Sequence, residues 1–135
     1  MSRRVTDQDY RQLLALRTAL RRFLRWSELE AEAAGITPAQ HQLMLAIRGH
    51  GGQQLPTIGD VAEHLLLRHH SAVGLVDRAE TAGLITKTRD EHDHRIVRVS
   101  LSQHGSEILR SLAAEHLEEL TRLGLIGNVA SDLLE

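Results

Sequence analysis

Residues 56–101 decide the fold, and they read PTIGDVAEHLLLRHHSAVGLVDRAETAGLITKTRDEHDHRIVRVSL. Thr57 and Asp60 match a capping box, which predicts a helix that begins just after Thr57. A turn over 66–68 leads into a second helix over about 69–81. The start of that helix is poorly specified, because no Ser, Thr, Asp or Asn precedes it.

The end of this stretch has the pattern of a β-hairpin. Gly83 can end the second helix in the left-handed conformation, and residues 84–88 and 96–101 are strand-like. Residues 89–95 between them are too polar to pack and are expected to lie in solvent or on a partner. Alternate residues of the second strand are apolar and should face the core, namely Val97, Val99 and Leu101.

Further helices are expected on both sides of this stretch. An apolar stripe near helical period predicts a long helix over 8–33. Thr37 caps a helix over 38–49, with Pro38 at its first position. Leu43, Leu45, Ala46 and Ile47 are its apolar residues. A long helix over 102–123 and a short one over 128–135 complete the chain. We therefore predict a mainly α fold of the α+β class.

The order helix, turn, helix, strand, charged loop and strand is that of a winged helix-turn-helix. This module places one helix in a DNA groove and a hairpin beside it. Arg68, His69, His70 and Ser71 lie at the start of the second helix, and Arg89 and Arg95 flank the hairpin loop. Arginine can grip guanine through two bonds, or enter a narrow minor groove. The alternative is that these residues form an ordinary solvated helix end and surface turn.

The composition fits one soluble domain. The chain has 135 residues, 41% of them hydrophobic, with no stretch long enough to span a bilayer. The absence of Cys excludes disulfides and thiolate metal sites. The basic N-terminus lacks the apolar run of a secretory signal, so we expect a cytoplasmic protein without membrane partners.

The net charge of −2 hides an uneven distribution. Residues 1–25 carry seven arginines and two aspartates, a net charge of +5, and residues 68–101 have a net charge of +1. The other two parts, 26–67 and 102–135, each have a net charge of −4. Local basic clusters matter more than the total when a protein meets phosphate. Fifteen of the sixteen basic residues are arginine, which genomic base composition can also explain.

Three segments resemble the multiple-antibiotic-resistance regulator (MarR) family of bacterial transcription factors. They are LVDRAETAGLI (75–85), RDEHDHR (89–95) and VRVSLSQHG (97–105). The matching pairs are Asp77-Arg78, Gly83-Leu84, Asp93-x-Arg95 and Leu101-Ser102. The resemblance implies a single domain over 1–135, with a DNA-binding lobe over 36–101. Asp93 would orient Arg95. The full set of implied DNA contacts is Thr57, Arg68, His69, His70, Ser71, Val73, Gly74, Arg78, Arg89, His94 and Arg95.

The resemblance also implies a homodimer that binds a near-palindromic operator. The dimerisation helices would lie in 5–34 and 102–135. Packing inside a single subunit is the alternative for their apolar residues. The expected dimer interface consists of Tyr10, Leu13, Leu16, Leu20, Leu112, Leu117 and Leu120.

A small aromatic ligand that loosens DNA binding is a partner implied by the family. Arg17, Trp26 and His41 could line its pocket, and the alternative for each residue is a core or solvent-facing position. We expect no cofactor and no metal. None of the nine His has another His four residues away, and there is no HExxH motif.

Two features depart from the family pattern, namely the tail after Gly124, which is short for the family, and three residues of the second helix. His69, His70 and Gly74 stand where hydroxyl or basic residues are usual, and Gly74 offers no side chain to a base. These three residues and the mixed wing charge leave open an alternative, a winged helix that binds protein and has no specific DNA target. We expect no enzyme, because the chain lacks a phosphate-binding loop, a nucleophile motif and paired carboxylates in a cleft.

Overall fold

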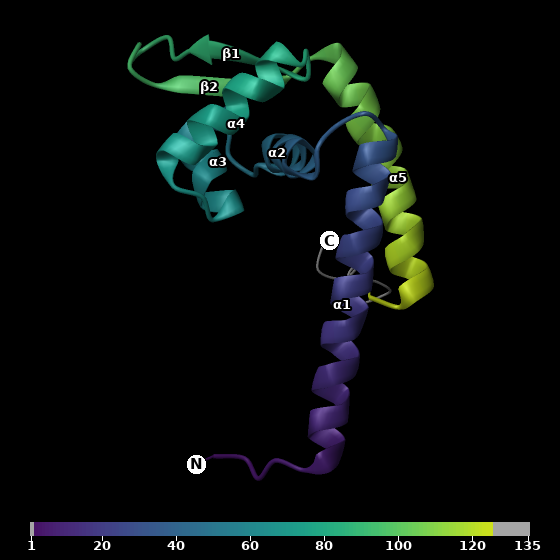
Figure 1. The fold of residues 1–135 in the computed structure, drawn as a ribbon. Coiled ribbons are helices and arrows are strands. Elements are labelled where there is room, and N and C mark those ends of the chain that lie inside the picture. Colours follow the sequence, from purple (N-terminus) through teal and green to yellow (C-terminus); the bar gives the residue numbers. More distant parts are fainter. Residues whose placement is uncertain (1, 126–135) are drawn as a thin grey trace.

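A computed structural model of the chain describes residues 2–125. It contains five helices and one two-stranded antiparallel sheet (Figure 1). The mainly helical fold of the prediction is confirmed. The short helix expected over 128–135 lies outside the described residues. The elements are α1 (Asp7–Ala33), α2 (Pro38–Gly49), α3 (Ile58–Leu65), α4 (His69–Thr81), β1 (Ile85–Arg89), β2 (Val97–Leu101) and α5 (Gln103–Leu123).

Side-chain caps explain where four of the helices begin. The hydroxyls of Thr6, Thr37 and Thr57 each accept a bond from a backbone N–H three residues on, and the residue at that position bonds back. Ser102 caps α5 through the N–H of Gly105. The capping box predicted at Thr57 is therefore confirmed.

The hairpin supplies one wall of the core. β1 pairs with β2 in the register Ile85 to Leu101 and Lys87 to Val99. Val99 is fully buried, and Val97 and Leu101 pack against the same core, as the alternation predicted. Each strand begins one residue later than the sequence suggested, because pairing rather than propensity sets its start.

Helix α2 buries only some of its apolar residues. Leu45 is 54% exposed, while Met44 beside it is completely buried. The helical repeat puts Leu43, Met44 and Ile47 on the inner face and turns Leu45 outward.

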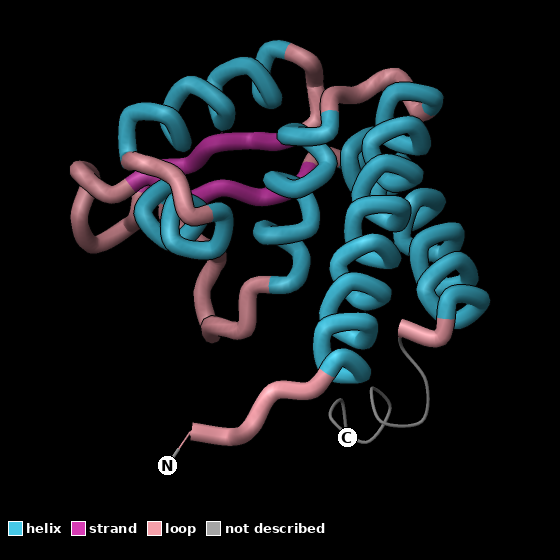
Figure 2. Tube along the Cα trace, turned by 60° about the horizontal axis from the view of Figure 1, so that its bottom comes forward, coloured by secondary structure: helices cyan, strands magenta, loops and turns pink. Residues whose placement is uncertain are grey.

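The molecule has two parts that meet along α5 and the end of α1. Helices α2, α3 and α4 and the hairpin form a lobe, whereas α1 and α5 run side by side (Figures 1 and 2). The N-terminal half of α1 continues past the end of α5 (Figure 1). Its apolar residues are therefore exposed, including Tyr10, Leu13, Leu14, Leu16 and Leu20.

Leu112 corrects the predicted dimer surface. It is only 3% exposed and belongs to the core of its own subunit, so it cannot also contact a second subunit. Leu117 is 57% exposed and Leu120 is half-buried. The difference arises because Leu109 and Leu112 occupy the buried face of α5, and Leu117 lies on another face.

Candidate nucleic-acid interface

Helix α4 presents polar residues at its N-terminus and buries its other face. Arg68, His69 and His70 are exposed, and Ser71 is half-buried. Among residues 2–125, α4 is the one helix whose N-cap makes no side-chain hydrogen bond. Its first N–H groups therefore have no partner from a cap residue, and such groups favour anions. The apolar face is buried in the lobe through Ala72, Leu75, Val76 and Ala79.

The predicted turn over 66–68 is confirmed and sets the angle between α3 and α4. Leu66 ends α3 in the left-handed region with φ 55°, and its side chain is 92% exposed. The N–H of Leu67 donates to the carbonyl of Ala62 at 2.9 Å, which closes the end of α3. The chain then enters α4 directly.

Arg78 covers the one position of α4 that lacks a side chain. A Cβ atom built at Gly74 would lie 3.1 Å from a terminal nitrogen of the Arg78 guanidinium. The arginine therefore lies over Gly74, one helical turn away. Val73 packs partly against the core. Of the candidate contacts Val73, Gly74 and Arg78, Arg78 is the one that is exposed.

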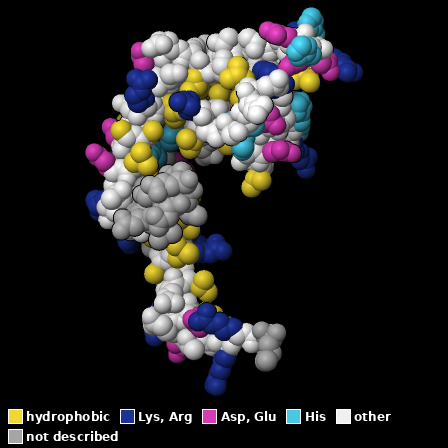
Figure 3. Space-filling model, turned by 180° about the vertical axis from the view of Figure 1, so that it is seen from behind, with side chains coloured by type: hydrophobic (Ala, Val, Ile, Leu, Met, Phe, Trp, Pro, Cys, Tyr) yellow, Lys and Arg dark blue, Asp and Glu magenta, His cyan; other side chains and the backbone are white. Residues whose placement is uncertain are grey.

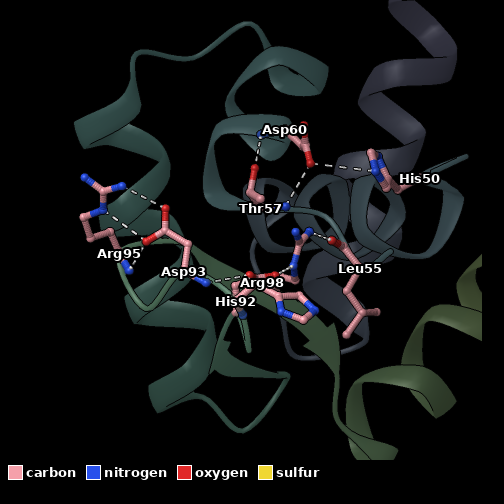
Figure 4. Close-up of polar contacts among 9 residues, drawn as sticks. His50, Leu55, Thr57, Asp60, His92, Asp93, Arg95 and Arg98 are labelled. Atoms are coloured by element: carbon pink, nitrogen blue, oxygen red, sulfur yellow. Dashed lines mark hydrogen bonds and ion pairs between the residues drawn. The ribbon is translucent and has the colours of Figure 1, made fainter. Parts of the chain in front are cut away.

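The wing is the loop of residues 90–96 between β1 and β2. Its Arg95 is 91% exposed, and Asp93 accepts bonds from Arg95 Nε and Nη2, both at 3.0 Å (Figure 4). Asp93 also accepts from the Arg95 N–H at 3.1 Å. The guanidinium holds the pKa of Asp93 below its ordinary value, and the carboxylate raises the pKa of Arg95. The two residues of the predicted Asp-x-Arg pair thus lie together.

Arg89 has a partner within the hairpin. Its Nη1 donates to the carbonyl of His94 at 2.7 Å across the mouth of the wing. This bond uses part of the guanidinium that the sequence assigned to DNA. His94 itself is exposed. Arg89 thus has a structural role in closing the wing.

A second ion pair at the base of the wing was not foreseen from the sequence. Arg98 Nε donates to Asp90 Oδ1 at 2.7 Å, and Arg98 Nη1 donates to the carbonyl of Leu55 at 2.7 Å (Figure 4). The pairing with Arg98 and bonds from the N–H groups of His92 and Asp93 hold the pKa of Asp90 below its ordinary value. Arg98 breaks the β-branched run of IVRVSL, which was the available signal.

A groove of about 340 Å³ brings the three parts of the candidate interface together. Thr57 and Gly59 line it from the start of α3, His69 from the start of α4, and Arg95 from the wing. The Thr57 hydroxyl is engaged in capping α3, where Asp60 N donates to it at 3.0 Å. That cap also lowers the pKa of Asp60.

The predicted ligand pocket is filled by another side chain. The ring of His116 lies with its centroid 4.8 Å from those of both Trp26 and His41. Ser27 Oγ is 2.6 Å from His116 Nε2, and His116 Nδ1 donates to the Leu112 carbonyl. Burial and then the nearby His116 lower the pKa of His41.

Arg17 does not join this ring cluster. It is exposed on α1, nine residues from Trp26, and a helix rises about 13 Å over that distance. The structure therefore brings Trp26 and His41 together and leaves Arg17 apart.

Two further features would bear on function in residues 2–125, namely a metal site and a membrane-spanning helix. No group of three or more metal-ligating side chains is placed to hold an ion in this part of the chain. His50 Nδ1 and His64 Nε2 lie 3.0 Å apart, and His50 Nε2 lies 3.8 Å from Asp60 Oδ2. No helix that the structure describes has the length and hydropathy to cross a bilayer.

Comparison with known proteins points to one family. The sequence model of the MarR family matches residues 34–96. The HTH-type transcriptional repressor MdtR of Bacillus subtilis is 28% identical over 97 residues, which cover 67% of this chain and 61% of MdtR. The chain thus spans less than two thirds of the length of this curated relative.

Solved structures share the fold. AbsC, a MarR family transcriptional regulator from Streptomyces coelicolor, has a TM-score of 0.75 at 20% identity, covering 98% of this chain and 90% of AbsC. A mutant of MepR from S. aureus, bound to an oligodeoxyribonucleotide, has a TM-score of 0.68 at 18% identity, covering 91% of this chain and 89% of MepR. At these identities the likeness establishes the winged-helix fold alone.

Proposed function

Because this chain belongs to the MarR family, whose members are transcription regulators and not enzymes, we propose that it binds a near-palindromic DNA operator as a homodimer. Residues 36–101 would read DNA, and the helices in 5–34 and 102–135 would join two subunits. Such a protein would work in the cytoplasm, where bacterial DNA lies.

The observation that carries this proposal is the groove that unites α3, α4 and the wing. It brings His69 within reach of the same ligand as Arg95, although 26 positions separate them in the chain. A helix N-terminus without a side-chain cap and an exposed, oriented guanidinium are both suited to phosphate and base edges. Arg68, His70, Ser71 and Arg78 are the further contacts that we propose on α4.

The exposed stripe of α1 supports the proposed dimer. Tyr10, Leu13 and Leu20 are each at least 43% exposed in the single subunit. Figure 3 shows apolar side chains gathered along the part of α1 that extends away from the lobe. Contiguous exposed apolar surface of this kind marks an interface. A two-fold dimer would place two copies of α4 on neighbouring half-sites.

A small aromatic acid remains our proposal for the releasing signal. The ring cluster of Trp26, His41 and His116 joins α1, α2 and α5, where the lobe meets the outer helices. An aromatic ligand would have to displace the His116 ring and would shift the lobe relative to α5. Trp26 is the only tryptophan, so its fluorescence should change when salicylate, the probe, is added. An unchanged signal with unchanged DNA affinity would contradict this part of the proposal.

The main test is a fluorescence-anisotropy titration on the DNA that flanks the gene of this protein, at two salt concentrations. Each phosphate contact should steepen the fall of log affinity with log salt by about 0.9. Arg95→Ala should weaken specific binding by about 1–3 kcal/mol. Arg122→Ala is the matched control, because Arg122 also pairs with a nearby acid, Glu119 three residues before it, but lies on α5.

The protein-binding alternative makes the opposite prediction. A winged helix without a DNA target would bind all fragments equally weakly, and Arg95→Ala would leave that binding unchanged. Salt-independent binding of the unaltered protein would likewise contradict a DNA-binding function.

A further inference from the structure

The wing is attached to the lobe through a hydrogen-bonded chain that ends at Arg95. It begins at the Leu55 carbonyl, just before α3, and continues through the guanidinium of Arg98 to the carboxylate of Asp90 (Figure 4). Asp90 Oδ2 accepts from the N–H of Asp93 at 3.0 Å, and the Asp93 side chain holds Arg95. Every step of this chain is a hydrogen bond of ordinary length.

Two of these groups are too enclosed to contact a large ligand themselves. The side chain of Arg98 is 18% exposed and that of Asp90 is 11% exposed, compared with 91% for Arg95. Both side chains already have hydrogen-bond partners, since the Asp90 carboxylate accepts three hydrogen bonds and the Arg98 guanidinium donates two. Any influence on DNA must therefore act through another residue.

We propose that Asp90 and Arg98 form a latch, a pair of positioning residues that holds the wing and its Arg95 at a fixed place beside α4. The latch rests on the proposed DNA binding. Without it, the loop would be fixed to the lobe only through β1 and β2, and its ordering would have to occur when DNA binds. Ordering side chains on binding costs about 0.5–1.5 kcal/mol for each one.

The Asp90–Arg98 pair differs from an ordinary surface ion pair because the guanidinium also donates to a backbone carbonyl. Arg98 uses different nitrogens for Asp90 and for the Leu55 carbonyl, so the planar guanidinium fixes both directions at once. The Val99 N–H also donates to the Pro56 carbonyl at 2.9 Å, which brings β2 against the start of α3. The latch thus joins the wing to the segment from which α3 begins.

Whether Asp90→Asn weakens or strengthens DNA binding shows whether Asp90 acts by positioning the wing or only through its negative charge. Removing a negative charge near DNA should by itself strengthen binding. Loss of the latch should instead weaken it, by roughly tenfold if the order of the wing must be restored on binding. Glu91→Gln is the matched control, because it makes the same charge change at an exposed position of the same loop and should bind DNA equally well or more tightly.

A double-mutant cycle tests whether the latch acts through Arg95. We expect Asp90→Asn to lower affinity roughly tenfold in the unaltered protein but less than about twofold when Arg95 is already Ala. Arg98→Lys keeps the charge but cannot span both acceptors, so its effect should be intermediate. Arg98→Met should weaken binding at least as much as Asp90→Asn, because it also removes a positive charge. Equal losses in both backgrounds would overturn the role of Arg95 as the residue positioned.

Hydrogen exchange of the free, full-length protein tests the latch without DNA. Amides of the wing should exchange faster in Asp90→Asn, while those of α3 and α4 stay protected and the thermal melt stays cooperative. Unchanged exchange in the wing would overturn the proposal, even if the protein had no DNA target. If exchange changes but the unaltered protein shows no salt-sensitive DNA binding, the proposed function fails and the structural latch stands.

Discussion

The lobe buries its leucines, whereas the N-terminal half of α1 exposes them. Leu43, Leu75 and Leu84 are at most 5% exposed in the lobe, whereas Leu13 and Leu14 of α1 are 59% and 64% exposed. The core of the lobe joins α2, α3, α4 and the hairpin with residues of α5 and of the end of α1. Helix α1 has α5 beside only its C-terminal part (Figure 1).

The contrast shows that the single chain buries the apolar side chains of the lobe but leaves those in the N-terminal half of α1 exposed. Burying a leucine side chain that would otherwise be exposed to water stabilises a fold by about 1.5–3 kcal/mol. The exposed leucines of α1 contribute none of this in a single subunit. A second subunit could bury these leucines and supply that stabilisation. The lobe should therefore stay folded in a variant whose α1 can no longer bind a second subunit.

The largest expected effect is the loss of the proposed dimer when Leu13→Asp and Leu20→Asp are combined. The two positions are seven residues apart and share one face of α1. Each buried leucine is worth about 1.5–3 kcal/mol, and a two-fold interface contains each substitution twice. Light scattering after size exclusion should then report a monomer at micromolar concentration.

The control for that experiment is Leu45→Asp, which alters a leucine of the lobe that is 54% exposed. It should leave the assembly state unchanged. A double variant that remains dimeric would contradict the assignment of the α1 stripe as the interface.

The next effect concerns the joint between the lobe and α5. A Cβ atom at Gly105 would lie 2.1 Å from the Leu84 carbonyl oxygen, so Gly105→Ala must push α5 away from the backbone of the hairpin. We expect a loss of about 3 kcal/mol in the free energy of unfolding, measured by denaturant titration. In Gly59→Ala the nearest atom is 3.5 Å away, and stability should not fall. Equal stability of the two variants would contradict the close contact.

A pH dependence of intermediate size should arise at the same joint. His41 is 7% exposed, and burial lowers its pKa, so the folded protein keeps it neutral. In the unfolded chain it gains a proton as the pH falls through about 6.5. Stability from this group is therefore present above that pH and is lost as the pH decreases below it.

Thermal melts between pH 5 and 7.5 measure this effect. His41→Gln should flatten the pH dependence of Tm, whereas the exposed His92→Gln should leave it as in the unaltered protein. If both variants keep the original pH dependence, His41 is not its source.

The smallest effect is expected inside α4. Gly74→Ala should stabilise α4 by up to about 1 kcal/mol, because alanine is the better helix former. The new Cβ atom would approach only the flexible end of Arg78, at 3.1 Å. Gly83→Ala should do the reverse, since Gly83 has φ +77°. A lower Tm for Gly74→Ala would show that Arg78 cannot move aside.

Local sequence signals predicted most of the lobe. The capping box at Thr57 and the apolar repeat of α4 act over a few residues, so α3 and α4 could be placed directly. The Asp93–Arg95 pair was also foreseeable, because its members are two positions apart. Arg98 and Leu55, by contrast, are 43 residues apart, and only folding brings them together.

The sequence by itself determined the order of elements and the winged-helix module, and it pointed to the polar residues that we propose as DNA contacts. These depend on helical and strand periodicity and on caps, which are local properties. The tertiary structure decided which leucines are buried, as Leu112 and Leu45 show, and placed His116 between Trp26 and His41. It also built the latch of Asp90 and Arg98. These outcomes depend on contacts between segments far apart in the chain, and no local pattern encodes them.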